Sequence, residues 1–196
     1  MLKKIIIGFF IFISCFAITY AAGDSIRCSP ELQNSLNLIR KIPDAQKLLA
    51  SIQNAGPISI VVTRSNLSQQ FGAYWDPDLR IISINPAAHS SEGELIGSIL
   101  FELHNASNTS RIDHIDHLAS TGKIDRENYI MAMERLEYEN SISAAQIADK
   151  GIQAGIFPRS ARLPTYSSFQ EHYYYQKLGG HSAWVGNVFD QLAPRP

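Results

Sequence analysis

A change of hydrophobic periodicity near the middle of the chain constrains the fold more than any other feature. Residues 58–63 form an apolar, β-branched run that is typical of a buried strand. Residues 71–75 and 79–84 flank an Asp-Pro-Asp turn sequence at 76–78, which predicts a hairpin. From Glu92 onward, apolar residues recur at the spacing of one helix face. We therefore expect an α+β fold in which a small antiparallel-containing sheet packs on helices.

The segments on either side of this region are predicted to be mostly helical. Residues 30–52 carry two short helical patterns, and a long helix is expected from the N-cap residue Asp125 to Gly151. A short aromatic helix is expected over residues 167–178. Residues 107–123, by contrast, are interpreted as a polar connection between two helices.

The N-terminal residues indicate export. Basic residues precede an apolar run over 5–18, and small residues follow it. This order is typical of a secretory signal peptide over residues 1–22. Residues 23–196 would then form one domain in the periplasm or outside the cell. Two alternatives remain, an uncleaved membrane anchor and a lipoprotein modified at Cys15.

Composition narrows the classes of partner. Without its leader the chain keeps only Cys28, so an internal disulfide is excluded. Stability must then come from an ordinary hydrophobic core, and about 170 residues are enough to bury one. A formal net charge of −1 gives no general attraction to nucleic acid or to anionic membranes. We expect a protein or peptide partner, no nucleic acid, and membrane contact only through an uncleaved or lipidated leader.

The helix that begins at Glu92 sets an acidic residue among apolar ones. Phe101 and Asn105 are four residues apart and share one side of the helix, and Glu102 lies beside them at the edge of the apolar face. His104 is two residues from Glu102 and points about 200° around the helix from it.

With a sheet before this helix and another helix after it, the chain resembles the zincin metallopeptidases over residues 58–150. Zincins carry a His-Glu-x-x-His helix in which two histidines bind zinc and the glutamate polarises the bound water. The matching segment is Phe101-Glu102-Leu103-His104-Asn105. In the glutamate-ligand branch a downstream helix supplies a third ligand, and Glu134 or Glu137 matches it by element order.

The two departures from the zincin motif exclude its usual metal centre. Phenylalanine has no lone pair to donate, and the neutral amide of Asn105 is a weak zinc ligand compared with imidazole. The resemblance therefore implies a degenerate site without metal or other cofactor. It also implies a substrate cleft beside the motif helix, with Tyr74 and Trp75 of the hairpin nearby.

Other residues have both functional and structural interpretations. Glu102 is either an inherited active-site residue or a half-exposed carboxylate with an ordinary partner. His114 and His117 are three residues apart among carboxylates, which makes them a weak alternative metal site in a segment where charged residues are common. Tyr174 and Tyr175 are candidates for exposed contacts.

Three functional hypotheses follow. The first is an exported zincin-like protein without metallopeptidase activity, which binds a polypeptide or regulates a partner through the cleft between residues 79–84 and the motif helix. The second is a hydrolase that uses Glu102 as general acid or base with His104, His114 or His117. The third is a secreted structural or interaction module.

Overall fold

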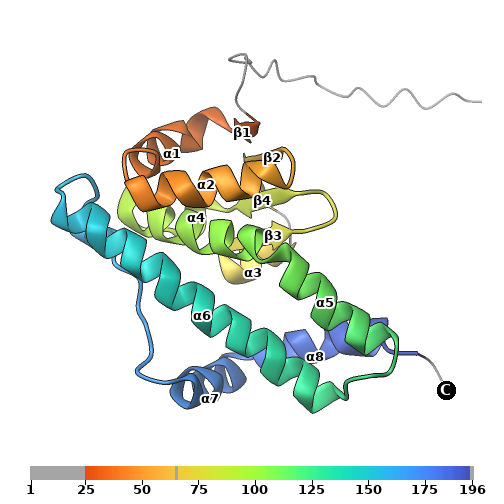
Figure 1. The fold of residues 1–196 in the computed structure, drawn as a ribbon. Coiled ribbons are helices and arrows are strands. Elements are labelled where there is room, and N and C mark those ends of the chain that lie inside the picture. The colour runs from red at the N-terminus through yellow and green to blue at the C-terminus, as the bar shows by residue number, and fades with distance from the viewer. Residues whose placement is uncertain (1–24, 65, 195–196) are drawn as a thin grey trace, which may run out of the picture.

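The computed structural model describes residues 25–64 and 66–194, so the expected signal peptide lies outside the described residues. These residues form eight α-helices and a four-stranded mixed sheet, which confirms the predicted α+β class (Figure 1). Three short 3-10 helices, at Pro30–Leu32, Pro86–Ala88 and Arg159–Ala161, complete the regular structure.

The sheet has the strand order β1-β2-β4-β3. Strands β1 (Ile26–Cys28), β2 (Ile58–Val62) and β4 (Ile81–Ile84) are parallel, and β3 (Ala73–Asp76) pairs antiparallel with β4. Alternate residues of the strands are buried, because one face of the sheet packs on helices. Among the described residues β3 is thus an edge strand, and it pairs with β4 on one side only.

Three helices form the layer that packs on the sheet. Helix α4 (Glu92–Ser107) contacts β3 and β4, and α1 (Gln33–Ile39) and α2 (Pro43–Asn54) pack against α4. Ser91 is the N-cap residue of α4, and its side chain accepts a hydrogen bond from the N–H of Glu94. The main core lies between these helices and the sheet.

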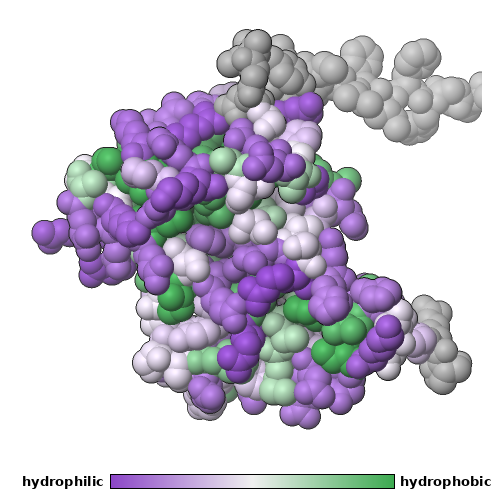
Figure 2. All heavy atoms as spheres, viewed as in Figure 1, coloured by the Kyte–Doolittle hydropathy of each residue, from purple (hydrophilic) through white to green (hydrophobic). Residues whose placement is uncertain are grey.

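Four helices build a second layer beside α4. Helix α6 (Arg126–Gln153) packs along α4 and then against α5 (Thr109–Ser120), α7 (Phe169–Gly179) and α8 (His181–Leu192) (Figure 1). A smaller apolar cluster lies between α5, α6 and α8. Figure 2 shows a mostly hydrophilic face, with hydrophobic side chains gathered over the end of the molecule where α5 and α8 lie.

Several elements differ from the prediction. The expected polar connection over residues 107–123 is wrong, because residues 109–120 form α5. Its apolar residues contact both cores, Ile112 the main one and Ile115 the smaller one, and this packing stabilises a helix whose composition is polar. Strand β1 and helices α3 (Asn66–Phe71) and α8 were not predicted. No helix within the described ranges is both long and apolar enough to cross a membrane.

Candidate functional site

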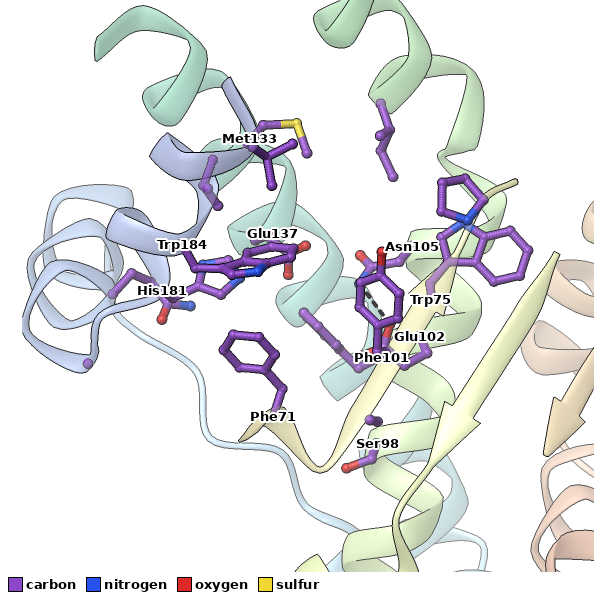
Figure 3. A pocket seen from close by; sticks show the side chains of 18 of the residues that line it. Phe71, Trp75, Ser98, Phe101, Glu102, Asn105, Met133, Glu137, His181 and Trp184 are labelled. Atoms are coloured by element: carbon purple, nitrogen blue, oxygen red, sulfur yellow. Dashed lines mark hydrogen bonds between the residues drawn. The ribbon is translucent and has the colours of Figure 1, made fainter. Parts of the chain in front are cut away.

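A pocket of about 480 Å³ lies where β3, α4, α6 and α8 meet (Figure 3). Phe101, Glu102 and Asn105 of α4 lie on one side of it, and Trp184 of α8 lies across from them with Glu137 of α6. Its volume is within the range of pockets that bind small ligands or single side chains.

The walls of this pocket combine aromatic rings with acidic groups. The aromatic lining residues are Phe71, Tyr74, Trp75, Phe101, Tyr129 and Trp184. The ionisable groups, besides the two tyrosines, are Glu102, Glu137, Asp116 and His181. No lysine or arginine lines the pocket among the described residues, so its carboxylates outnumber its basic groups.

Glu102 is a buried carboxylate with neutral hydrogen-bond donors. Its side chain is 6% exposed, and it accepts a hydrogen bond from Asn105 Nδ2 at 3.1 Å and another from the backbone N–H of Trp75. Asn140 of α6 in turn donates to Asn105 Oδ1 at 2.7 Å, which fixes the orientation of that amide. Burial, followed by the nearby charge of Glu137, raises the pKa of Glu102 to about 8.

Glu137 is the second acidic group of the pocket. Burial raises its pKa to about 7, although the charge of His181 favours the ionised form. Because Glu102 and Glu137 repel each other as anions, the pair is expected to hold a proton near neutral pH.

His181 is held in the pocket wall by a buried carboxylate. Its Nδ1 lies 3.0 Å from Glu134 Oε1, and Ser182 Oγ donates to the same oxygen at 2.6 Å. His172 Nε2 lies 3.4 Å from the other Glu134 oxygen, an ion-pair distance without hydrogen-bond alignment. Burial would raise the pKa of Glu134, but these partners outweigh it and lower the pKa to about 2. Burial would likewise lower the pKa of His181, but the hydrogen bond and charge of Glu134 raise it.

The structure brings most of the candidate residues together. Six of them line the pocket: Tyr74, Trp75, Phe101, Glu102, Asn105 and Glu137. Glu134 contacts His181 instead and is fully buried behind the pocket wall. Glu102 is buried and not half-exposed, although it does have a backbone donor, the N–H of Trp75, as the structural interpretation expected.

The three histidines proposed as helpers of Glu102 do not reach it. His104 is absent from the pocket lining, and burial lowers its pKa to about 4 while Nε2 has no hydrogen-bond partner. His114 and His117 are exposed on α5. The described residues contain no group of three or more side chains placed to hold a metal ion. The histidine of the pocket is His181, which sequence reasoning missed.

The cleft was also assigned to the wrong strand. Strand β4, within the predicted 79–84 segment, is interior to the sheet, and β3 borders the pocket instead. The N–H of Asn85 donates to the carbonyl of Gly72, so Gly72 bonds to the β4 side. In an antiparallel pair, alternate residues direct their main-chain groups toward the partner strand, so the N–H and C=O groups of Ala73 and Trp75 point to the outer edge of β3. The hydrogen bond from the Trp75 N–H to Glu102 agrees with this orientation.

A serine and a histidine lie close together at the rim. Ser98 Oγ is 2.8 Å from His89 Nε2, and His89 Nδ1 is 2.9 Å from the carbonyl oxygen of Asn85. Acyl transfer would also need free N–H donors for the oxyanion, but Ser98 lies within α4, where the helix uses the N–H groups. We interpret the pair as a structural link between α4 and the turn that follows β4.

Comparisons of the chain with protein families, with curated proteins and with solved structures found no match in any of the three.

Proposed function

We propose that this chain is an exported zincin-like protein without metallopeptidase activity, which binds a polypeptide segment in the pocket beside β3. The observation that carries the proposal is the shared location of Phe101, Glu102 and Asn105 on the pocket side of α4, next to β3, whose outer edge pairs with no other strand among the described residues.

The strand edge supports a polypeptide as ligand. An extended segment can add to an edge strand through main-chain hydrogen bonds while one of its side chains enters an adjacent pocket. Outward-facing groups of Ala73 and the carbonyl of Trp75 supply such bonds, and Trp75 also lines the pocket.

A pocket-filling variant tests this binding. Val188 of α8 lines the pocket, whereas Ala183 on the same helix is exposed and outside it. Peptides selected from a displayed random library on residues 23–196 should bind Val188→Trp at least tenfold more weakly and Ala183→Trp unchanged. Equal binding to both variants, or no selected peptide, would refute the proposal.

A variant with restored metal ligands tests whether the pocket has the geometry of a zincin metal site. Phe101→His with Asn105→His recreates the two zincin histidines beside Glu137, which then serves as the third ligand. This double variant should retain about one zinc per chain after dialysis, measured by elemental analysis, and the unaltered chain should retain none. Arg135→His with Glu139→His is the control, because it places two histidines four apart on α6 outside the pocket. Zinc in the unaltered chain, or the same affinity in both double variants, would contradict the proposal.

A second function is favoured by the two acidic groups themselves. Carboxyls with pKa values of about 8 and 7 in one pocket suit general acid–base catalysis at neutral pH. In this hydrolase, Glu102 or Glu137 would exchange a proton with substrate, and Glu134 would orient His181. Glu102→Gln and Glu137→Gln should each lower turnover of a chromogenic ester, amide or glycoside at least a hundredfold, and Glu139→Gln should not. If no substrate in such a panel is turned over, the hydrolase candidate fails.

A further inference from the structure

The pocket contains more carboxyl groups than basic groups that could pair with them. Glu102, Glu137 and Asp116 all line it, and Asp116 accepts a hydrogen bond from the Tyr129 hydroxyl at 2.7 Å. Among the described residues the Glu137 carboxylate accepts no hydrogen bond, and the donors to Glu102 are neutral. His181 is the one basic lining group in the described chain, and it already pairs with Glu134.

Aromatic rings line the same pocket. The Phe71 ring contacts Trp184 and His181 edge to face, with ring centroids 5.4 Å and 5.7 Å apart. Tyr74 contacts Trp184 in the same manner, at 6.3 Å. The faces of aromatic rings carry negative charge density and attract cations, and most strongly where water is excluded.

We propose that the pocket binds an organic cation, an ammonium or guanidinium group at the end of an apolar stem, such as the side chain of a lysine or arginine. This inference rests on the proposed polypeptide binding and names the side chain that enters the pocket. The apolar stem packs among the aromatic rings while the charged end pairs with Glu102 and Glu137.

Other ligand classes fit this chemistry less well. An anion would be repelled by any ionised carboxylate of the pair, and a neutral ligand supplies no positive charge to replace the proton that the pair holds near neutral pH. A cation, by contrast, favours the ionised form of both carboxylates, so its binding should release protons into solution. The groups that face the pair are Tyr74 from β3, Asp116 from α5, Gln176 from α7 and His181 from α8.

The two tryptophans of the chain, Trp75 and Trp184, both line the pocket, so their fluorescence reports its occupation. The probes are the acetylated, amidated pentapeptide Gly-Gly-Lys-Gly-Gly, the same peptide with norleucine, free hexylammonium, and cellotriose. The lysine peptide should bind at least tenfold more tightly than the norleucine peptide. Its affinity should rise as pH rises from 6 to 9, and calorimetry in two buffers should show proton release.

Variants connect this preference to the carboxylates. Glu137→Gln should reduce the preference for lysine over norleucine at least tenfold, and Glu139→Gln, on the same helix outside the pocket, should keep it. Equal or tighter binding of the norleucine peptide overturns the cation inference and leaves polypeptide binding standing. Binding of hexylammonium without either peptide supports the cation inference and refutes polypeptide binding. Binding of cellotriose alone, or of no probe, refutes both.

Discussion

Replacing Glu102 by glutamine should make the folded chain less sensitive to alkaline pH. Because the pKa of Glu102 is about 8 in the folded state and about 4.5 in the unfolded state, the folded chain holds a proton that the unfolded chain has already released between these values. Folding stability therefore falls as pH rises toward 8. Glutamine carries no ionisable proton, so its contribution does not change with pH.

The size of the effect follows from linkage. Across pH 6.5 to 8, a group that is protonated only in the folded state changes the free energy of unfolding by about 1.4 kcal/mol per pH unit, which amounts to about 2 kcal/mol for Glu102. Glu137 and His181, whose pKa values are also raised, change stability in the same direction but remain in the variant. His104, whose pKa is about 4 in the folded state and about 6.5 in the unfolded state, changes stability in the opposite direction, mainly below pH 6.5, and it also remains in the variant.

Urea unfolding of residues 23–196 at pH 6.5, 7.5 and 9 measures this difference. The gap in unfolding free energy between the Glu102→Gln variant and the unaltered chain should move by about 2 kcal/mol in favour of the variant between pH 6.5 and 9, with unchanged m-values. Glu139→Gln alters a partly exposed carboxylate paired with Arg111 and should show no such change. If the unaltered chain keeps its stability over this range, or if the variant loses as much, Glu102 is not the buried, neutralised group described above.

Three further predictions concern packing and the support of His181. Gly151→Ala should destabilise the fold by about 1–3 kcal/mol, measured by thermal or urea unfolding, because the added Cβ would lie 2.1 Å from the ring of buried Phe157. Gly186→Ala should change stability by less than about 1 kcal/mol, because its Cβ meets the flexible end of Arg126, which can move away; a larger loss would show that this guanidinium is fixed. Ser182→Ala removes the 2.6 Å hydrogen bond to Glu134 and should lower the free energy of unfolding by about 1–3 kcal/mol. The affinity for the lysine peptide should fall by no more than about twofold, and a tenfold fall in affinity would place Ser182 in the binding site.

Local sequence signals predicted the elements that position one half of the pocket. The apolar spacing after Glu92 gave α4, Asp125 caps α6 through a hydrogen bond from the N–H of Asn128, and the turn at 76–78 gave the hairpin. Such signals are strong where pattern and cap occur together. The side of α4 that carries Phe101, Glu102 and Asn105 followed from helix geometry alone.

The other half of the pocket depends on contacts between residues that are far apart in the sequence. His181 and Glu134 are 47 positions apart, and nothing local pairs them. A signal for α8 was present, since Val185, Val188, Phe189 and Leu192 follow helical spacing after Gly180. The strand order places β4 inside the sheet and β3 at its edge, and parallel pairing of β2 with β4 cannot be deduced from the strand sequences themselves.

The arrangement around Glu134 shows how buried acids in this protein can differ in purpose. Glu134 is surrounded by His181, His172 and Ser182, and its pKa is low, so its charge is neutralised within the fold. Glu137 lies three residues after Glu134 on α6, and Glu102 lies on the neighbouring helix α4. Burial raises the pKa of both, and no histidine hydrogen-bonds to either of them among the described residues. The fold pairs histidines with Glu134 but supplies no histidine hydrogen bond to buried Glu102 or half-buried Glu137 among the described residues, and this difference lowers stability at the pocket. Such local losses are expected where a ligand supplies the missing charge, and this contrast is the physical reason to seek a cationic ligand for the pocket.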